Sequence, residues 1–198
     1  ASEEAFYDLL DCRTKNGRPC LFTSNDNYAE LQSRFSAEYG EPIVARIADF
    51  CDRLNAAGIK YLIGGSVASG VWGQPRQTND VDFEVWLDAR NIQAFEAACG
   101  PPFEVSISEL TTAVASADEF RMVQVMHTEE LVRFDCFLQG HSPIDQAAHE
   151  RAVEIEILAG RFVRVASAEH ILVQKLRWYE LGRRVSERQW RDMLAIVQ

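Results

Sequence analysis

The sequence predicts an α/β protein in which helices alternate with short strands. Apolar residues recur at helical spacing over residues 42–58, which predicts a helix that ends at a glycine. The apolar run 59–63 then enters Gly64-Gly65-Ser66, after which a second helix can begin. Residues 80–86 alternate with period two, which is typical of a strand. These patterns indicate a strand, a tight turn and a helix, followed by a further strand.

The rest of the chain continues this alternation. Asp88 and Ser167 are expected to cap helices, Gly160 to form the turn of a hairpin, and Gly182 to end the helix that Ser167 begins. Ser186-Glu187-Arg188-Gln189 has the pattern of a capping box and predicts a last helix. The other expected elements are helices over 89–99, 109–116 and 144–152, strands over 120–127 and 131–138, and a hairpin of 153–158 with 161–166.

The composition is that of a folded protein without a membrane span. Of its 198 residues 47% are hydrophobic and 25% charged, and no apolar run approaches the roughly 20 residues that cross a bilayer. No signal pattern opens the chain, so we expect a cytoplasmic protein with no membrane partner. The five scattered cysteines include no C-x-x-C pair, which favours ordinary reduced thiols.

The charge is acidic overall but unevenly distributed. The formal net charge of −10 argues against binding to duplex DNA. Residues 161–198 hold eight of the 20 Lys and Arg but only four of the 30 Asp and Glu, so this part carries about +4 and the rest about −14. If any part of the chain meets phosphates, this part is favoured, although a solvated basic helix face gives the same pattern.

Two carboxylates share one face of the strand predicted at 80–86. Asp80 and Asp82 point to the same side, about 6–7 Å apart along the backbone, so their side chains can converge. A hard divalent cation with oxygen ligands would relieve the repulsion between them. The same D-x-D pattern is common on exposed strand faces, so by itself it does not establish a metal site.

The turn before these acids has the chemistry of a phosphate site. Glycines let backbone N–H groups approach a phosphate, a serine hydroxyl adds a donor, and the N-terminus of the next helix favours an anion. Gly64, Gly65 and Ser66 are therefore candidate phosphate ligands. A flexible glycine link between an ordinary strand and helix would show the same residues.

A third acid lies in an otherwise apolar strand. Asp135 interrupts the strand predicted at 131–138, where burial of a carboxylate without a partner is costly. We therefore expect it to face a cation. Glu84 is the alternative third acid because it shares a face with Asp80 and Asp82, and we expect it to support the site rather than join it.

Lys175 lies in the apolar stripe of the helix that Ser167 begins. Its neighbours at helical spacing include Ile171 and Trp178, so the ammonium either snorkels to the surface or reaches a triphosphate. Four histidines, His170 among them, show no metal-ligand spacing and are interpreted as ordinary side chains. Tryptophans such as Trp178 are expected in the core, although one aromatic residue can stack on a nucleobase.

The order of these motifs resembles the signature of the polymerase beta-type nucleotidyltransferases. Gly64-Gly65-Ser66 is followed by Pro75-Arg76-x-Thr78-x-Asp80-Val81-Asp82, and Arg133-Phe134-Asp135 is similar to the family's later acid motif. The resemblance implies a palm-like fold, a small mixed sheet flanked by helices. It also implies transfer of a nucleoside monophosphate from a nucleoside triphosphate, such as ATP, to an acceptor hydroxyl, with two Mg²⁺ ions or alternatively Mn²⁺ as cofactors.

The resemblance also assigns the site residues and the domains. Asp80, Asp82 and Asp135 would be the catalytic and metal-binding acids, with Asp135 alternatively taking the proton of the acceptor. The triphosphate would be bound by Gly64, Gly65, Ser66, Arg76, Thr78 and Lys175. Residues 1–41 would be an extension of unknown role, 42–166 the catalytic core, and 167–198 a helical C-terminal part.

The C-terminal part is similar to the AbiEii-like, minimal bacterial branch of this family. The similarity is carried by Ser167-x-Glu169, Lys175-Leu176 and Asp192; members commonly have an acid where this chain has His170. Because that branch includes toxins of toxin–antitoxin systems, an antitoxin is a candidate partner. The alternatives are therefore a toxin that acts on RNA or protein, or a nucleotide-binding domain without catalysis. The acceptor, a small molecule, RNA or protein, stays open.

Overall fold

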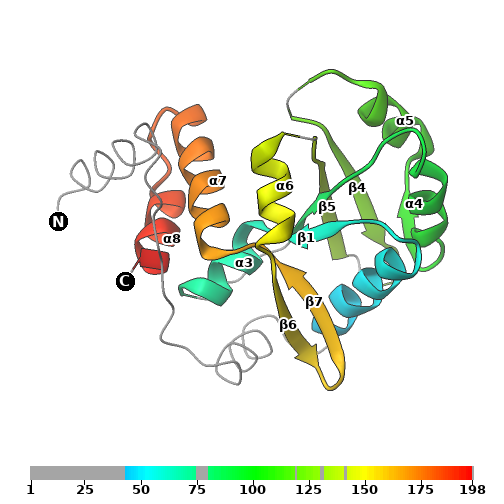
Figure 1. Ribbon diagram of the computed structural model, residues 1–198, viewed down its shortest axis with the longest axis horizontal. Coiled ribbons are helices and arrows are strands. Elements are labelled where there is room, and N and C mark those ends of the chain that lie inside the picture. The colour runs from blue at the N-terminus through cyan, green and yellow to red at the C-terminus, as the bar shows by residue number, and fades with distance from the viewer. Residues whose placement is uncertain (1–42, 75–79, 119, 130–131, 141, 198) are drawn as a thin grey trace.

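A mixed seven-stranded β-sheet forms the centre of the molecule, with the strand order β3-β4-β5-β2-β1-β7-β6 (Figure 1). The computed structural model describes residues 43–74, 80–118, 120–129, 132–140 and 142–197. The strands are β1 (Tyr61–Ile63), β2 (Asp80–Val85), β3 (Phe103–Val105), β4 (Met122–His127), β5 (Val132–Leu138), β6 (Val153–Leu158) and β7 (Arg161–Val165). The expected α/β fold, a mixed sheet flanked by helices, is confirmed.

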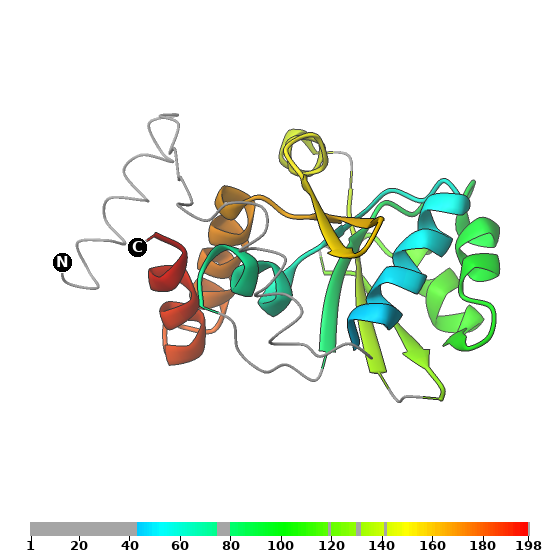
Figure 2. The same ribbon diagram turned by 90° about the horizontal axis from the view of Figure 1, so that it is seen from below.

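Helices lie on both sides of this sheet. Residues 43–56 are helical, and the later helices are α3 (Gly65–Trp72), α4 (Ile92–Ala98), α5 (Ile107–Ala115), α6 (Pro143–Glu150), α7 (Ala168–Leu181) and α8 (Glu187–Val197). The helix 43–56, α4 and α5 lie on one side, and α3, α7 and α8 on the other (Figure 2). None of the described helices is long and apolar enough to cross a membrane.

The central strand β2 separates an apolar face from a polar one. Its register pairs it antiparallel with β1 and parallel with β5. Val81, Phe83 and Val85 are buried toward the helix 43–56, whose Phe50 ring lies 5.2 Å from the Phe83 ring. Because side chains alternate along a strand, Asp80, Asp82 and Glu84 fall on the opposite face. The period-two pattern thus directs all three acids to the side of α3 and α7.

The helix α3 is fixed by the elements around it. It leaves β1 through Gly64, whose N–H donates to the carbonyl of Asp82 at 2.8 Å. At its other end the indole N–H of Trp72 donates to the carbonyl of Ala166 at 2.7 Å, and a Cβ on Gly73 would lie 2.9 Å from Ala195 of α8. The N-terminus of α3 is therefore held rigidly beside β2.

The middle of the chain differs from the expectations in one helix boundary and in one additional strand. The helix expected over 89–99 begins at Ile92, because the Asp88 carboxylate accepts from the N–H and side chain of Arg90 and organises a turn instead of a cap. The strand Phe103–Val105 was not expected; it is a short edge strand paired with β4. The expected extension 1–41, together with Arg76 and Thr78, lies outside the described residues.

Candidate active site

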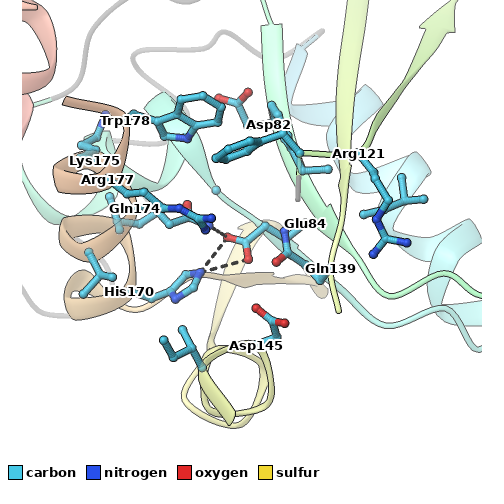
Figure 3. Close-up of a pocket in the computed structure, with 18 of the residues that line it drawn as sticks. Asp82, Glu84, Arg121, Gln139, Asp145, His170, Gln174, Lys175, Arg177 and Trp178 are labelled. Atoms are coloured by element: carbon cyan, nitrogen blue, oxygen red, sulfur yellow. Dashed lines mark hydrogen bonds and ion pairs between the residues drawn. The ribbon is translucent and has the colours of Figure 1, made fainter. Parts of the chain in front are cut away.

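A cavity of about 780 Å³ opens on the polar face of β2, between α3, α6 and α7 (Figure 3). Six of the predicted site residues line it, namely Gly64, Gly65, Ser66, Asp80, Asp82 and Lys175. Asp135 is not among the lining residues, but its Cα is the register partner of that of Asp82 on the neighbouring strand. The fold thus brings together residues that are up to 111 positions apart in the sequence.

The glycine turn and Asp82 fit each other closely. Gly65 has a φ of +53°, and a Cβ at this position would lie 1.6 Å from Oδ2 of Asp82. No side chain can therefore be accommodated at residue 65 without displacing the carboxylate. The backbone N–H of Ser66 donates to the same carboxylate, so the first amides of α3 face the acids. This is the position at which a helix N-terminus stabilises an anion.

Three acids and one arginine meet beside this turn. Arg133 of β5 bridges two of the acids, with Nη2 2.8 Å from Oδ2 of Asp80 and Nε 3.1 Å from Oδ1 of Asp135. The second contact has ion-pair distance without hydrogen-bond alignment, and both of its atoms are buried and have no hydrogen-bond partner among the described residues. The cation expected beside Asp135 is thus supplied in part by Arg133, which leaves one carboxylate oxygen incompletely satisfied.

The clustering changes the protonation of Asp82. Burial, followed by the nearby charges of Asp80 and Asp135, raises the pKa of Asp82 from 3.8 to about 6. The Ser66 N–H and the positive charge of Lys175 act in the opposite direction but do not cancel this effect. The site therefore carries more negative charge than its surroundings stabilise.

This set of residues fits a hard divalent cation. The donors are carboxylate oxygens, Oδ1 of Asp135 accepts no hydrogen bond from the described part of the chain, and a cation would lower the charge repulsion at Asp82. Among the described residues no three Asp, Glu, His or Cys side chains are already arranged as a closed metal cage. Mg²⁺ commonly needs only one or two carboxylates, because phosphates and water complete its shell. Asp80 and Asp82 are the residues that would hold it.

Glu84 forms a separate polar cluster deeper in the cavity. It is 3% exposed and accepts from Nε2 of Gln174 at 2.7 Å, while its two oxygens lie 2.9 and 3.0 Å from Nε2 of His170. Figure 3 shows both side chains reaching from α7 toward the carboxylate. Both oxygens of Glu84 are thus engaged, and the cluster ties α7 to β2.

His170 and Gln174 were missed by sequence reasoning. His170 was interpreted as an ordinary histidine, and its contact with Glu84 spans 86 residues. One sequence feature indicates this cluster: His170 and Gln174 have i, i+4 spacing on one helix, and an earlier strand carries Glu84 as a third acid.

Lys175 is buried in an ion pair. Its Nζ lies 2.6 Å from Oδ2 of Asp192 and 3.2 Å from Oε1 of Gln189, both on α8, and its exposed fraction is 5%. Because it also lines the cavity, its positive charge acts on Asp82 while the pair joins α7 to α8. The alternative that the Lys175 ammonium snorkels to the surface is therefore wrong. Its binding to a triphosphate stays a prediction.

Trp178 is not in the core. Its side chain is 41% exposed and lines the cavity together with Phe120 and Phe137. The core position was predicted from helical spacing, which places Trp178 on the apolar face of α7. Part of this face lines the cavity instead of packing on the core. Trp72 and Trp190 are half-buried and pack against the core.

Comparison with solved structures identifies the fold. ANT(2'')-Ia in complex with adenylyl-2''-tobramycin matches with a TM-score of 0.53 and 15% identity, over 79% of this chain and 88% of that chain. A nucleotidyltransferase-like protein from Paracoccidioides brasiliensis matches with a TM-score of 0.51 and 21% identity, over 82% and 75%. TM1012 of Thermotoga maritima, a proposed nucleotidyltransferase, matches with 0.50 and 14%, over 76% and 93%.

The likeness is one of structure and not of sequence. A scan against models of known protein families found no match, and no curated protein matched either. At 14–21% identity the solved structures establish the shared architecture alone. The chain therefore has the fold of these nucleotidyltransferases, in line with the polymerase beta-type resemblance of its motifs.

Proposed function

We propose that this protein is a nucleotidyltransferase that moves a nucleoside monophosphate from a nucleoside triphosphate to an acceptor hydroxyl. This proposal rests on one observation: Asp80, Asp82 and Asp135 lie beside the glycine turn that begins α3. Acids alone would repel a triphosphate, and a glycine turn alone offers no group that activates a hydroxyl. Their combination supports phosphoryl-type chemistry assisted by a metal ion.

Each residue has a role in this proposal. Asp80 and Asp82 would hold Mg²⁺, for which Mn²⁺ can substitute, and Asp135 would join them or take the proton of the acceptor hydroxyl. When bound, the divalent ions neutralise charge on the phosphates and stabilise an in-line displacement of pyrophosphate.

The remaining groups bind the donor. The amides of Gly64, Gly65 and Ser66 position the triphosphate at the start of α3, and the predicted ligands Arg76 and Thr78 precede Asp80 in the chain. Lys175 offsets negative charge near Asp82, in keeping with its effect on the pKa of that carboxyl.

We further propose that the acceptor is a small molecule. A cavity of about 780 Å³ lies in the range of small-molecule sites, and a net charge of −10 disfavours a polyanion. On the same fold, the structure of ANT(2'')-Ia holds adenylyl-2''-tobramycin, a small molecule that carries an adenylyl group. An RNA or protein acceptor, with an antitoxin as partner, is the competing proposal that the AbiEii-like motifs suggest; growth arrest on expression would favour it.

The proposal is tested by pyrophosphate release from each nucleoside triphosphate, with a small-molecule extract as the source of acceptors. We expect release that requires Mg²⁺ or Mn²⁺, stops in EDTA, and falls at least about 100-fold in Asp82→Ala. Glu104→Ala, which removes an exposed acid on β3, is the matched control and should keep full activity. Undiminished release by a folded Asp82→Ala protein would refute the assignment.

A further inference from the structure

Three aromatic side chains from separate elements form a wall in the cavity. Phe120 precedes β4, Phe137 lies on β5 and Trp178 lies on α7. The Phe120 and Trp178 ring centroids are 5.0 Å apart and tilted by 41°, and those of Phe137 and Trp178 are 6.3 Å apart. These are the separations at which aromatic rings stabilise one another. The wall is therefore preformed.

Much of this wall is open to the cavity. Phe120 is 43% and Trp178 41% exposed. Exposed large rings that gather in a concave site indicate ligand binding more strongly than single apolar residues scattered on a surface. The guanidinium of Arg177 lies 4.8 Å from the centroid of the Phe120 ring, which adds a planar cation beside the wall.

The wall shares its cavity with the predicted phosphate site. The same cavity is lined by Gly64, Gly65, Ser66 and Asp82 and by the three rings, which lie toward β4 and the C-terminal half of α7. One part thus has backbone amides and acids suited to a metal-bound phosphate chain, and another part has flat apolar faces. A ligand that fits both parts at once carries a polyphosphate and an aromatic ring.

We propose that Phe120, Phe137 and Trp178 form the nucleobase subsite of this protein. The inference rests on the proposed function, because it assigns a place to the base of the nucleoside triphosphate donor. Rings and bases stack through their π faces, so the subsite accepts any base and favours the larger purines. Alanine substitution of a stacking ring typically weakens binding by about 10-fold or more.

The test compares the binding of ATP with that of inorganic tripolyphosphate by titration calorimetry in the presence of Ca²⁺, chosen to limit turnover. We expect the wild-type protein to bind ATP at least about 10-fold more tightly than tripolyphosphate. Phe120→Ala and Trp178→Ala should lose most of this advantage and bind tripolyphosphate normally. Phe162→Ala, which removes a 48% exposed ring on β7 outside the cavity, is the matched control and should behave as wild type.

Other results separate the possible failures. Equal wild-type affinity for ATP and tripolyphosphate, or variants that keep the full ATP advantage, would overturn the nucleobase subsite and leave the proposed function standing. Variants that release pyrophosphate more slowly at unchanged ATP affinity would also overturn the nucleobase subsite, because this result would assign the wall to the acceptor. Wild-type protein that binds neither compound would overturn both proposals. Trp178→Leu keeps an apolar side chain and replaces Trp178→Ala if thermal unfolding shows the latter to be misfolded.

Discussion

Asp82 is held in a site that disfavours its charge. Its carboxyl is buried beside Asp80 and Asp135, and its pKa of about 6 lies above the 3.8 of the unfolded chain. The folded protein therefore binds a proton at Asp82 more tightly than the unfolded chain does. Ionisation of Asp82 lowers the free energy of unfolding as the pH rises from about 4 through 6.

Asp82→Asn should therefore stabilise the protein when divalent metal is absent. In EDTA at pH 7.5 we expect the free energy of unfolding to rise by about 1–2 kcal/mol, because an uncharged amide removes the repulsion. The gain should vanish near pH 4, where Asp82 is protonated in the wild-type protein. Urea denaturation at several pH values measures this, with Glu104→Gln as an exposed control. A gain that does not change with pH would contradict the explanation.

Lys175 combines a structural contact with a predicted role at the site. Lys175→Met should lower the free energy of unfolding by about 3–5 kcal/mol, since it breaks the buried ion pair with Asp192. Lys175→Met/Asp192→Leu removes both charges and should recover most of the loss. If the lysine acts only through the fold, the double variant also recovers nucleotide affinity. Our proposal expects affinity to stay low in a double variant of normal stability, as calorimetry can determine.

At the scale of elements, the link between β1 and α3 determines where the acids lie. Gly65→Ala should both destabilise the protein and abolish nucleotide binding, because its Cβ would overlap Asp82. Gly160→Ala is the matched control: its φ of +75° gives similar backbone strain, but no atom of the described residues lies within 4 Å of the added Cβ. We expect about 1–2 kcal/mol of destabilisation at Gly160 and clearly more at Gly65. Equal stability loss with intact binding would disprove the close fit.

The second link between elements is the cluster that joins α7 to β2. His170→Ala removes one of the two side chains that contact the buried Glu84 and should cost about 2–4 kcal/mol of stability. Leu181→Ala, an exposed position on the same helix, should cost little. Denaturant unfolding compares the two. A cost at His170 no larger than at Leu181 would show that the contact does not hold α7 in place.

Local sequence patterns predicted much of the fold, but they predicted only part of the candidate site. Period-two alternation at 80–86 gave both the strand and the shared face of its acids, and burial of Asp135 followed from its apolar neighbours. The edge strand Phe103–Val105 has only three residues, too few for a periodic signal. The contacts of Glu84 with His170 and of Lys175 with Asp192 depend on the packing of α7, which no local pattern encodes.

At the scale of the whole molecule, one cavity joins groups from both ends of the described chain. The β1–α3 turn and β2 supply the amides and acids, while α7 contributes Lys175 and Trp178. The fold is that of nucleotidyltransferases, but fold alone does not fix a reaction. We propose that the group transferred by this protein contains the α-phosphate of the donor.

The most direct test supplies the protein and Mg²⁺ with ATP labelled at either the α- or the γ-phosphate, together with a small-molecule extract freed of cellular enzymes, and asks which label becomes attached to an acceptor. We expect attachment of the α label, recovery of the γ label as pyrophosphate, and loss of both in Asp82→Ala. Attachment of the γ label, as a kinase would give, or attachment of the α label by Asp82→Ala at the wild-type rate, would contradict this proposal.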